Sequence, residues 1–177
     1  AVLSHYAKHH KTGEPMPKAL ADRLTATATF NQGYSLTEVL GAAVLDMRWH
    51  SMPAGSAEQP AGPFEAGVLE QSGLDLPQVP PRYRSSYFLH IWANGYEAGY
   101  YAYLWAEMLD NDAYQWFVEH GGLTRANGDR FRQMILSRGN AGDYAALYRA
   151  FRGQDPTIEP MLKRRGISAA AEPAKRP

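Results

Sequence analysis

The sequence contains no cysteine, so disulfide bonds and thiolate chemistry are excluded. It has no uninterrupted apolar run of the roughly eighteen residues that a membrane-spanning helix needs, so we expect no membrane partner. An excess of either charge is also missing. Because 18 basic residues balance 18 acidic ones, no overall field favours nucleic acid. The lack of cysteine fits a reducing compartment, and we expect a cytoplasmic protein.

What the sequence does have is the composition of a globular domain. Hydrophobic residues make up 45% of the 177 residues and aromatic residues 12%, which is enough for a sizeable core. The chain opens with AVLSHYAKHH, which has neither an initiator methionine nor a signal-peptide pattern, so we expect a piece of a longer protein. The last segment, 168–177, is rich in small residues, charges and proline. This predicts a domain over 1–167 followed by a flexible tail.

Helical patterns cover most of the chain, and strand patterns are nearly missing. Ser35 and Glu38 have the spacing of a capping box and predict the start of a helix over 35–52. The segment 75–88 has three prolines within five positions and should be extended or turning. Other helices are predicted over 16–30, 64–74, 96–120, 124–139, 143–153 and 159–166. The predicted fold class is all-α, with roughly seven to nine helices.

The stretch from His90 to Trp105 holds six aromatic residues in sixteen positions. On a helix, Tyr96, Tyr100 and Tyr103 would fall within an arc of about 60°. Another face carries the better candidates for the core, namely Tyr101, Leu104, Trp105 and Met108. Two interpretations of the three tyrosines stay open. Their hydroxyl groups could donate to a developing oxyanion, or they could be half-buried packing residues whose hydroxyl groups find ordinary partners.

The sequence VPPRYRSSYFLHIWANGYEAGYYAYLW, residues 79–105, resembles the C-terminal part of bacterial peptidyl-dipeptidases. These enzymes belong to the thimet oligopeptidase and neurolysin family of zinc metallopeptidases. The similarity continues through FNQGY, LDMRWHS, QWFVEHGGLTRANGDRFRQMILSRGN and FRGQDPTIEPMLKRRG. It implies a helical enzyme with two half-domains around a deep channel, of which this chain is a multi-helix C-terminal subdomain. It also implies an activity that releases dipeptides from the C-terminus of oligopeptides.

The resemblance implies different roles for the two walls of the channel in such an enzyme. Zinc is held by two histidines of an HExxH helix and a downstream glutamate, while the motif glutamate acts as general base. The opposite wall contacts the peptide and stabilises the tetrahedral intermediate. Residues His90, Tyr96 and Tyr103 match that wall as catalytic residues. Tyr100 and Gly95 match substrate-binding positions, and the loop around Gly95 is expected to be mobile.

This sequence departs from the family pattern in one important respect. None of its six histidines begins an HExxH motif, so the zinc ligands should lie outside this chain. We therefore expect no metal site here and no peptidase activity from the isolated chain. His5 and His9 are four positions apart, a spacing that lets two imidazoles on a helix share a metal. Because no third ligand is identifiable, a solvated helix face is the preferred interpretation.

Two further questions are left open by the residues. Arg82 and Arg84 could bind the C-terminal carboxylate of a peptide, or they could form structural ion pairs. The whole chain could also be a non-catalytic helical interaction or scaffold module with tyrosines at its interface. The expected partners are an oligopeptide substrate and the N-terminal portion of the same enzyme. Exposed interface should also make the isolated chain self-associate.

Overall fold

The computed structural model describes residues 2–93 and 95–167, and it is helical in character over these ranges. The elements are α1 (Leu3–Tyr6), α2 (Lys18–Ala26), α3 (Gln32–His50), α4 (Ala61–Gln71), the 3-10 turn η1 (Ser85–Tyr87), α5 (Leu89–Ala93), α6 (Ala102–Glu119), α7 (Arg125–Met134), the 3-10 turn η2 (Leu136–Arg138), α8 (Tyr144–Arg152) and α9 (Glu159–Arg164). Within the described ranges, β pairing is limited to one isolated bridge between Lys8 and Pro15. The all-α prediction is confirmed. The predicted tail at 168–177 lies outside the described residues.

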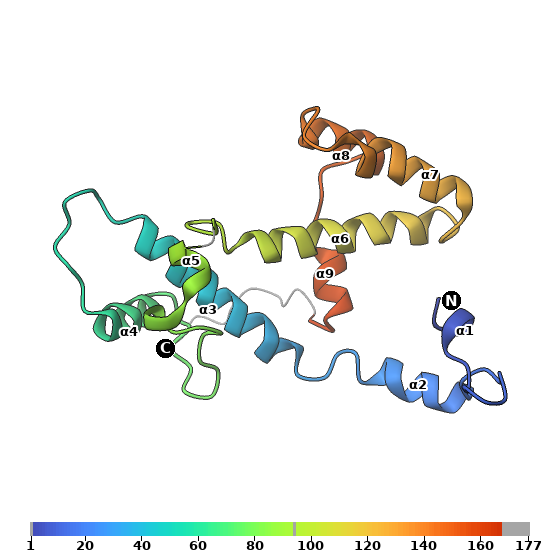
Figure 1. The fold of residues 1–177 in the computed structure, drawn as a ribbon, viewed down its shortest axis with the longest axis horizontal. Helices are drawn as coiled ribbons and strands as arrows, with labels where there is room; N and C mark the ends of the chain where they lie inside the picture. Colours follow the sequence, from blue (N-terminus) through green and yellow to red (C-terminus); the bar gives the residue numbers. More distant parts are fainter. Residues whose placement is uncertain (1, 94, 168–177) are drawn as a thin grey trace, which may run out of the picture.

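The helices form an open, elongated arrangement (Figure 1). The long helix α3 runs through its middle, with α4 and α5 beside its C-terminal half. The second long helix, α6, carries the hairpin of α7 and α8 at its far end, and α9 packs against α6. Helices α1 and α2 extend away from the rest at one end (Figure 1). Accordingly, α2 has no buried residue, and the predicted apolar positions Leu20 and Leu24 are exposed.

The described hydrophobic core is divided into three clusters rather than gathered in one place. The first joins α3 to α5 and to the turn before α6, through Ala42, Ala43, Phe88, Ile91 and Tyr100. The second joins α3 to α4, through Leu45, Val68 and Leu69. The third joins α6, α7 and α8, through Ala113, Trp116, Phe117, Tyr148 and Phe151. Helix α3 therefore serves two clusters, and α6 belongs to a separate one at its far end.

Several predicted helix ends are confirmed and others are wrong. The Thr124 hydroxyl accepts the backbone N–H of Asn127 and caps α7 as predicted, and Gly153 closes α8 with a φ of 87°. The capping box at Ser35 is wrong, because α3 starts at Gln32, after Asn31 in a left-handed conformation. Helix α6 begins at Ala102, later than predicted, because the chain makes a separate turn over 95–101.

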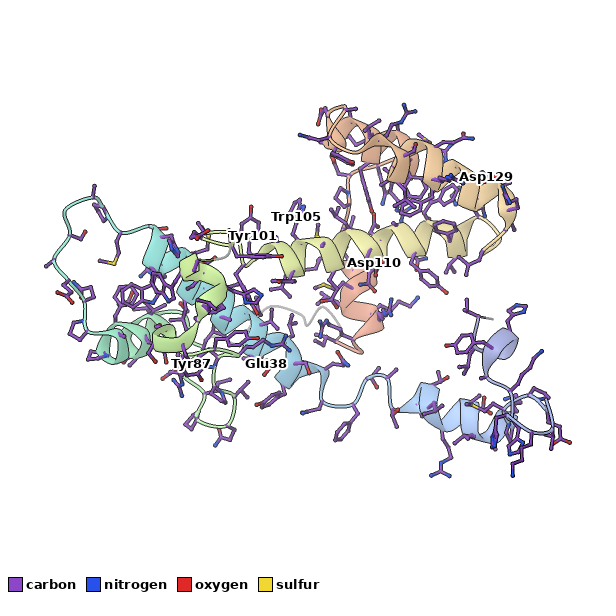
Figure 2. The ribbon with its side chains drawn as sticks, in the orientation of Figure 1. Glu38, Tyr87, Tyr101, Trp105, Asp110 and Asp129 are labelled. Atoms are coloured by element: carbon purple, nitrogen blue, oxygen red, sulfur yellow. The ribbon has the colours of Figure 1, made fainter. Side chains whose placement is uncertain are left out.

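The prediction for the buried face of α6 is wrong for Tyr101 and Trp105, whereas Leu104 and Met108 are partly buried. Tyr101 is 50% exposed and Trp105 is 54% exposed, and Tyr100 is only 4% exposed. Figure 2 shows Tyr101 and Trp105 at the start of α6. Their side chains line an almost wholly apolar groove of about 290 Å³, the α3/α6/α9 groove, formed by Leu36, Leu40, Tyr101, Leu104, Trp105, Met108, Ile158, Met161 and Leu162. Apolar periodicity identifies a face that prefers to leave water, but it does not say what covers that face.

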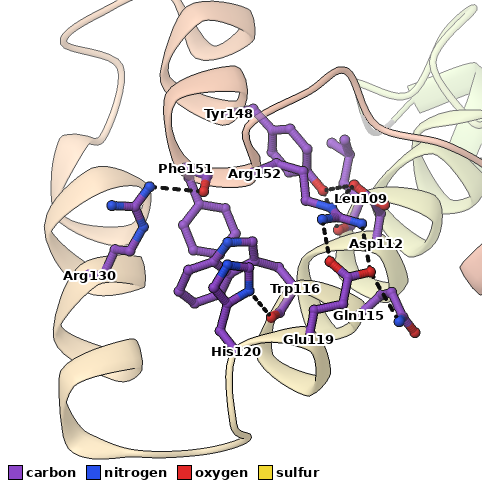
Figure 3. A network of polar contacts seen from close by, with 10 residues as sticks. All are labelled: Leu109, Asp112, Gln115, Trp116, Glu119, His120, Arg130, Tyr148, Phe151 and Arg152. Atoms are coloured by element: carbon purple, nitrogen blue, oxygen red, sulfur yellow. Dashed lines mark hydrogen bonds and ion pairs between the residues drawn. The ribbon is translucent and has the colours of Figure 1, made fainter.

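A polar network fixes the second half of α6 against α8 (Figure 3). Asp112, which is fully buried, accepts the Tyr148 hydroxyl at 2.8 Å and Arg152 Nε at 3.1 Å. Arg152 also donates to Glu119 at 2.7 Å. Burial raises the pKa of Tyr148, and the hydrogen bond to Asp112 raises it further. This network lies at the far end of α6 from the aromatic residues considered next (Figures 1 and 3).

Candidate functional site

The structure brings the predicted histidine and tyrosines into one group of touching rings. We call Tyr83, His90, Tyr96, Tyr100 and Tyr103 the aromatic cluster. The ring of His90 lies 5.4 Å from that of Tyr96, and Tyr96 stacks on Tyr103 at 5.4 Å with only 5° between the planes. Tyr100 lies 5.0 Å from Tyr103 and 6.3 Å from His90. Residues on α5, on the turn over 95–101 and on α6 therefore converge on one place.

Burial separates the tyrosines of the cluster into two kinds. Tyr100 is buried and meets Phe88 edge to face at 4.8 Å, so its ring belongs to the core. Burial raises its pKa, as does the neighbouring Tyr83. Tyr103 is 43% exposed, and the neighbouring Tyr96 hydroxyl raises the pKa of Tyr103 to about 12. Like a tyrosine at its ordinary pKa of about 10, Tyr103 is neutral at physiological pH, so its hydroxyl can donate a hydrogen bond.

The turn that carries Tyr96 and Tyr100 has unusual backbone angles. Gly95 has a φ of 74°, a region that glycine enters without steric cost. The residue before it, Asn94, lies outside the described residues. Ala98 has a φ of 55°, which is uncommon for a residue with a side chain. The turn is held from below by Asp46 of α3, whose buried carboxylate accepts backbone N–H groups from the turn.

Sequence reasoning missed two members of this site. Tyr83 stacks between Phe88 at 4.9 Å and His90 at 6.2 Å, and it lies between the two arginines that were considered. The position of Tyr83 between two arginines in the segment PPRYRSS was the sequence signal that could have identified it. Asp46 was missed as well, although it is an acidic residue among apolar neighbours in α3. An ionisable side chain on a buried helix face indicates a specific partner.

The two candidate arginines both form ion pairs. Arg82 Nη2 lies 2.8 Å from Glu38 Oε1, and this hydrogen bond is the main reason that the pKa of Arg82 is raised. Tyr100 also contributes to the raised pKa of Arg82, so this arginine lies near the aromatic cluster. Arg84 Nη1 lies 2.5 Å from the buried Glu65, on α4. Both contacts are ion pairs of the kind expected if the two arginines have a structural role.

Glu65 connects α4 to the segment that leads into the cluster. Its Oε2 accepts the backbone N–H of Ser85 at 2.8 Å and the Ser85 hydroxyl at 3.0 Å. Burial alone would raise the pKa of Glu65. The hydrogen bonds from Arg84 and Ser85 outweigh this effect, so the pKa lies below its ordinary value of 4.5. The ionised carboxylate is thus the form that the folded chain stabilises.

The remaining histidines do not assemble a metal site. Helix α1 ends at Tyr6, so the prediction that His5 and His9 share a helix face is wrong, whereas both residues are exposed to solvent as predicted. His9 instead contacts the ring of His10 and the backbone of Thr12. Among residues 2–93 and 95–167, no three histidine, cysteine, aspartate or glutamate side chains are grouped as metal ligands would be. The described part of this chain therefore does not fit a zinc centre by itself.

The same described part contains no helix with the length and apolar character needed to cross a membrane.

The sequence pattern of peptidase family M3 matches residues 1–167, which is most of the chain. The chain belongs to peptidase family M3. Members of family M3 are zinc metallopeptidases.

Relatives of known name support the family membership. The chain is 57% identical over 166 residues to a dipeptidyl carboxypeptidase of Salmonella typhimurium and 53% identical over 167 residues to one of Escherichia coli. It is also 34% identical over 167 residues to oligopeptidase A of Salmonella typhimurium. Each alignment covers 94% of this chain and 24% of the relative. The chain thus spans about a quarter of the length of the M3 relatives that it matches.

Glu65 should give this chain an acid-dependent stability. Because its pKa is lowered on folding, its contribution is complete above the ordinary value of 4.5 and is lost as the pH falls through the folded value. We expect Glu65→Gln to lower the free energy of unfolding by about 1–3 kcal/mol at pH 7, since a charge-assisted hydrogen bond and an ion pair are lost. The difference from wild type should be complete above pH 4.5 and should shrink as the pH falls below that value. Urea unfolding followed by circular dichroism measures it.

The control is Glu58→Gln, which makes the same chemical change on an exposed loop residue. This variant should match wild type at every pH within about 0.5 kcal/mol. A Glu65→Gln deficit that stays constant as the pH falls below 4.5 would contradict the assignment.

Proposed function

We propose that this chain is the substrate-side portion of a zinc metallopeptidase that releases dipeptides from the C-terminus of oligopeptides. The observation that carries the proposal is the contact of His90, Tyr96 and Tyr103 in a single cluster with exposed phenol edges. Membership of family M3 and the names of the most similar relatives support the same activity.

The chemistry of the cluster suits stabilisation of a tetrahedral intermediate. When water adds to a peptide carbonyl, negative charge develops on the carbonyl oxygen, and preorganised neutral donors lower the energy of that state. Tyr103 is protonated at neutral pH, as a tyrosine with a pKa of about 10 or higher is, so its hydroxyl can donate to the oxygen. Tyr96 stacks beside it and supplies a second phenol, and the imidazole of His90 lies on the other side of Tyr96. We assign direct substrate contacts to these three residues.

The remaining predicted residues have supporting roles in this proposal. Tyr100 is buried, so we assign it to shaping the wall rather than to transition-state contact. Gly95 provides the backbone conformation from which the turn starts. Arg82 is the better candidate for a peptide carboxylate, because it lies beside Tyr100 and is nearly half exposed. Arg84 is already engaged by the buried Glu65.

The proposed enzyme requires residues beyond this chain. Zinc would activate the attacking water, and we propose that its ligands lie in another part of the same protein. We propose accordingly that the N-terminal portion of the enzyme is a partner of this chain, and that the 177 residues alone are inactive. A cytoplasmic location remains part of the proposal, on the grounds given by the sequence.

Replacing Tyr103 tests the role of its hydroxyl. In the full-length enzyme, Tyr103→Phe should lower kcat for an oligopeptide by about 10²-fold, as loss of an oxyanion donor does in other enzymes. The change in KM should be small, because the hydrogen bond forms mainly in the transition state. Steady-state kinetics that follow dipeptide release measure both constants.

Tyr101→Phe is the matched control, since it removes the same hydroxyl from a tyrosine two positions earlier, which lies in the α3/α6/α9 groove instead. Its kinetic constants should equal those of wild type. If Tyr103→Phe has unchanged turnover, Tyr103 is not part of the mechanism.

Zinc content tests where the ligands lie. The 177-residue chain, with its mass confirmed, should hold far less than one zinc per chain after dialysis, because its described residues do not group as ligands. The full-length enzyme should hold one zinc. Elemental analysis by mass spectrometry measures both. One tightly bound zinc per 177-residue chain would show a site within it, and His5 and His9 would then be mutated first.

A second candidate function, a helical interaction module, is favoured by one specific observation. The α3/α6/α9 groove is apolar, and Tyr101 and Trp105 are half exposed along it. Exposed apolar surface of this kind is typical of interaction sites. In the first proposal the rest of the enzyme covers this groove, whereas in the second an independent partner does.

Either alternative predicts that the isolated chain self-associates through the groove. Sedimentation velocity should show concentration-dependent dimers or larger species at about 100 µM, a concentration at which weak contacts of this kind are populated. Trp105→Glu should shift the chain towards monomer, because a carboxylate in an apolar interface is costly. Tyr114→Glu changes an exposed aromatic residue elsewhere on α6 and should leave association unchanged. A wild-type monomer at all concentrations would contradict the prediction.

A further inference from the structure

Asp46, near the C-terminus of α3, is completely buried beneath the turn that leads into α6. Its Oδ1 accepts the backbone N–H of Ala98 at 3.0 Å, and its Oδ2 accepts that of Tyr100 at 2.8 Å. His50, one helical turn further on, places Nδ1 2.9 Å from Oδ1 and 3.0 Å from the backbone carbonyl oxygen of Asp46. A carboxylate is retained without water only where such donors replace its hydration. Each oxygen of Asp46 is therefore used by a specific partner.

The turn that Asp46 holds is one that the backbone does not adopt readily. Ala98 has a φ of 55°, where its Cβ crowds the backbone. Residues persist in such conformations when surrounding contacts over-determine them. The N–H groups of Ala98 and Tyr100 lie on either side of Gly99, and the turn directs both towards the carboxylate. Asp46 thus compensates for the conformational cost of the turn.

The geometry of the exposed phenols depends on this turn. Tyr96 precedes it and Tyr103 follows it, yet their rings stack with 5° between their planes. Tyr100, whose amide Asp46 binds, fits its ring between Phe88 at 4.8 Å and Tyr103 at 5.0 Å. A change in the path of the chain between residues 96 and 100 would therefore separate Tyr96 from Tyr103.

We propose that Asp46 is a positioning residue of the peptidase site: its carboxylate fixes the turn over 95–101 and thereby the relative placement of Tyr96 and Tyr103. This inference rests on the proposed function. Asp46 is buried under the backbone, so it does not touch the substrate. It acts through two backbone amides, and its effect on turnover should pass through the tyrosines that they position.

Asp46→Asn is the informative substitution because it preserves size. Asparagine has one carbonyl oxygen and one NH₂ group, so one of the two backbone N–H groups must then face a donor. Asp112→Asn is the matched control. Asp112 is the other fully buried aspartate of the described residues, and it belongs to the α6–α8 network at the far end of α6. Both variants lose a buried charge, but only one of them affects the turn.

The experiment uses the full-length enzyme and four variants: Asp46→Asn, Asp112→Asn, Tyr103→Phe and the double variant Asp46→Asn with Tyr103→Phe. We expect Asp46→Asn to lower kcat by about 10–10²-fold, the scale of an ångström misplacement of a reacting group, with a smaller change in KM. Asp112→Asn should keep wild-type kcat even if it melts at a lower temperature. The double variant should be little slower than Tyr103→Phe, because both changes disable the same donor. Wild-type kcat in Asp46→Asn, or losses that multiply in the double variant, would overturn the proposal.

Two further measurements keep the test decisive. If Asp46→Asn does not fold, His50→Phe removes the Nδ1 contact at the end of α3 and keeps the aspartate. The His50→Phe variant should also lower kcat, by a smaller factor than Asp46→Asn, and an unchanged kcat would overturn the proposal. Hydrogen–deuterium exchange of peptides covering 96–101 should accelerate in Asp46→Asn and not in Asp112→Asn. That exchange reports on the turn even if Tyr103→Phe shows that the proposed function is wrong, so the two failures are distinguishable.

Discussion

The structure of the aromatic cluster depends on a buried carboxylate that binds backbone amides. Asp46 connects α3 to a turn more than fifty residues later in the chain, and Glu65 on α4 binds the backbone of Ser85 in the same manner. In both cases a helix supplies a fixed acceptor, and an irregular segment supplies N–H groups that no secondary structure would satisfy. The two irregular segments on either side of α5 are thus attached to α3 and α4. The aromatic rings are placed by polar contacts with the backbone as well as by packing.

The divided core explains why such contacts are needed. Because the three apolar clusters are small and separate, no single one surrounds the segment between η1 and α6. Helix α3 provides the common support, since it takes part in two clusters and also carries Asp46. None of the apolar side chains of the α3/α6/α9 groove belongs to these three clusters, although Met161 is buried. The same helices therefore support the candidate site on one side and offer an uncovered apolar surface on another.

Sequence patterns predicted the helical class, several helix positions and most members of the cluster, and each success has a local cause. The cap at Thr124 and the end of α8 at Gly153 follow from nearest-neighbour chemistry. The face of α6 could not be predicted in this way. Tyr100 is buried and Tyr101 is exposed because a distant carboxylate determines where the helix begins. Asp46 and Tyr83 were missed for a related reason. The partners of Asp46 are remote in sequence, and the partners of Tyr83 come close to it only because of the way the chain turns.

The distribution of charge around the cluster is consistent with its use as a set of neutral donors. A free carboxylate beside the phenols would accept hydrogen bonds from their hydroxyl groups and oppose a developing oxyanion. Two acidic groups near the cluster are instead directed elsewhere: Asp46 binds backbone amides, and Glu38 pairs with Arg82. Tyr96 and Tyr103 interact chiefly with each other, which raises the pKa of Tyr103 and keeps its proton in place. Asp46 and Glu38 thus hold the wall in position while each is engaged by its own partner.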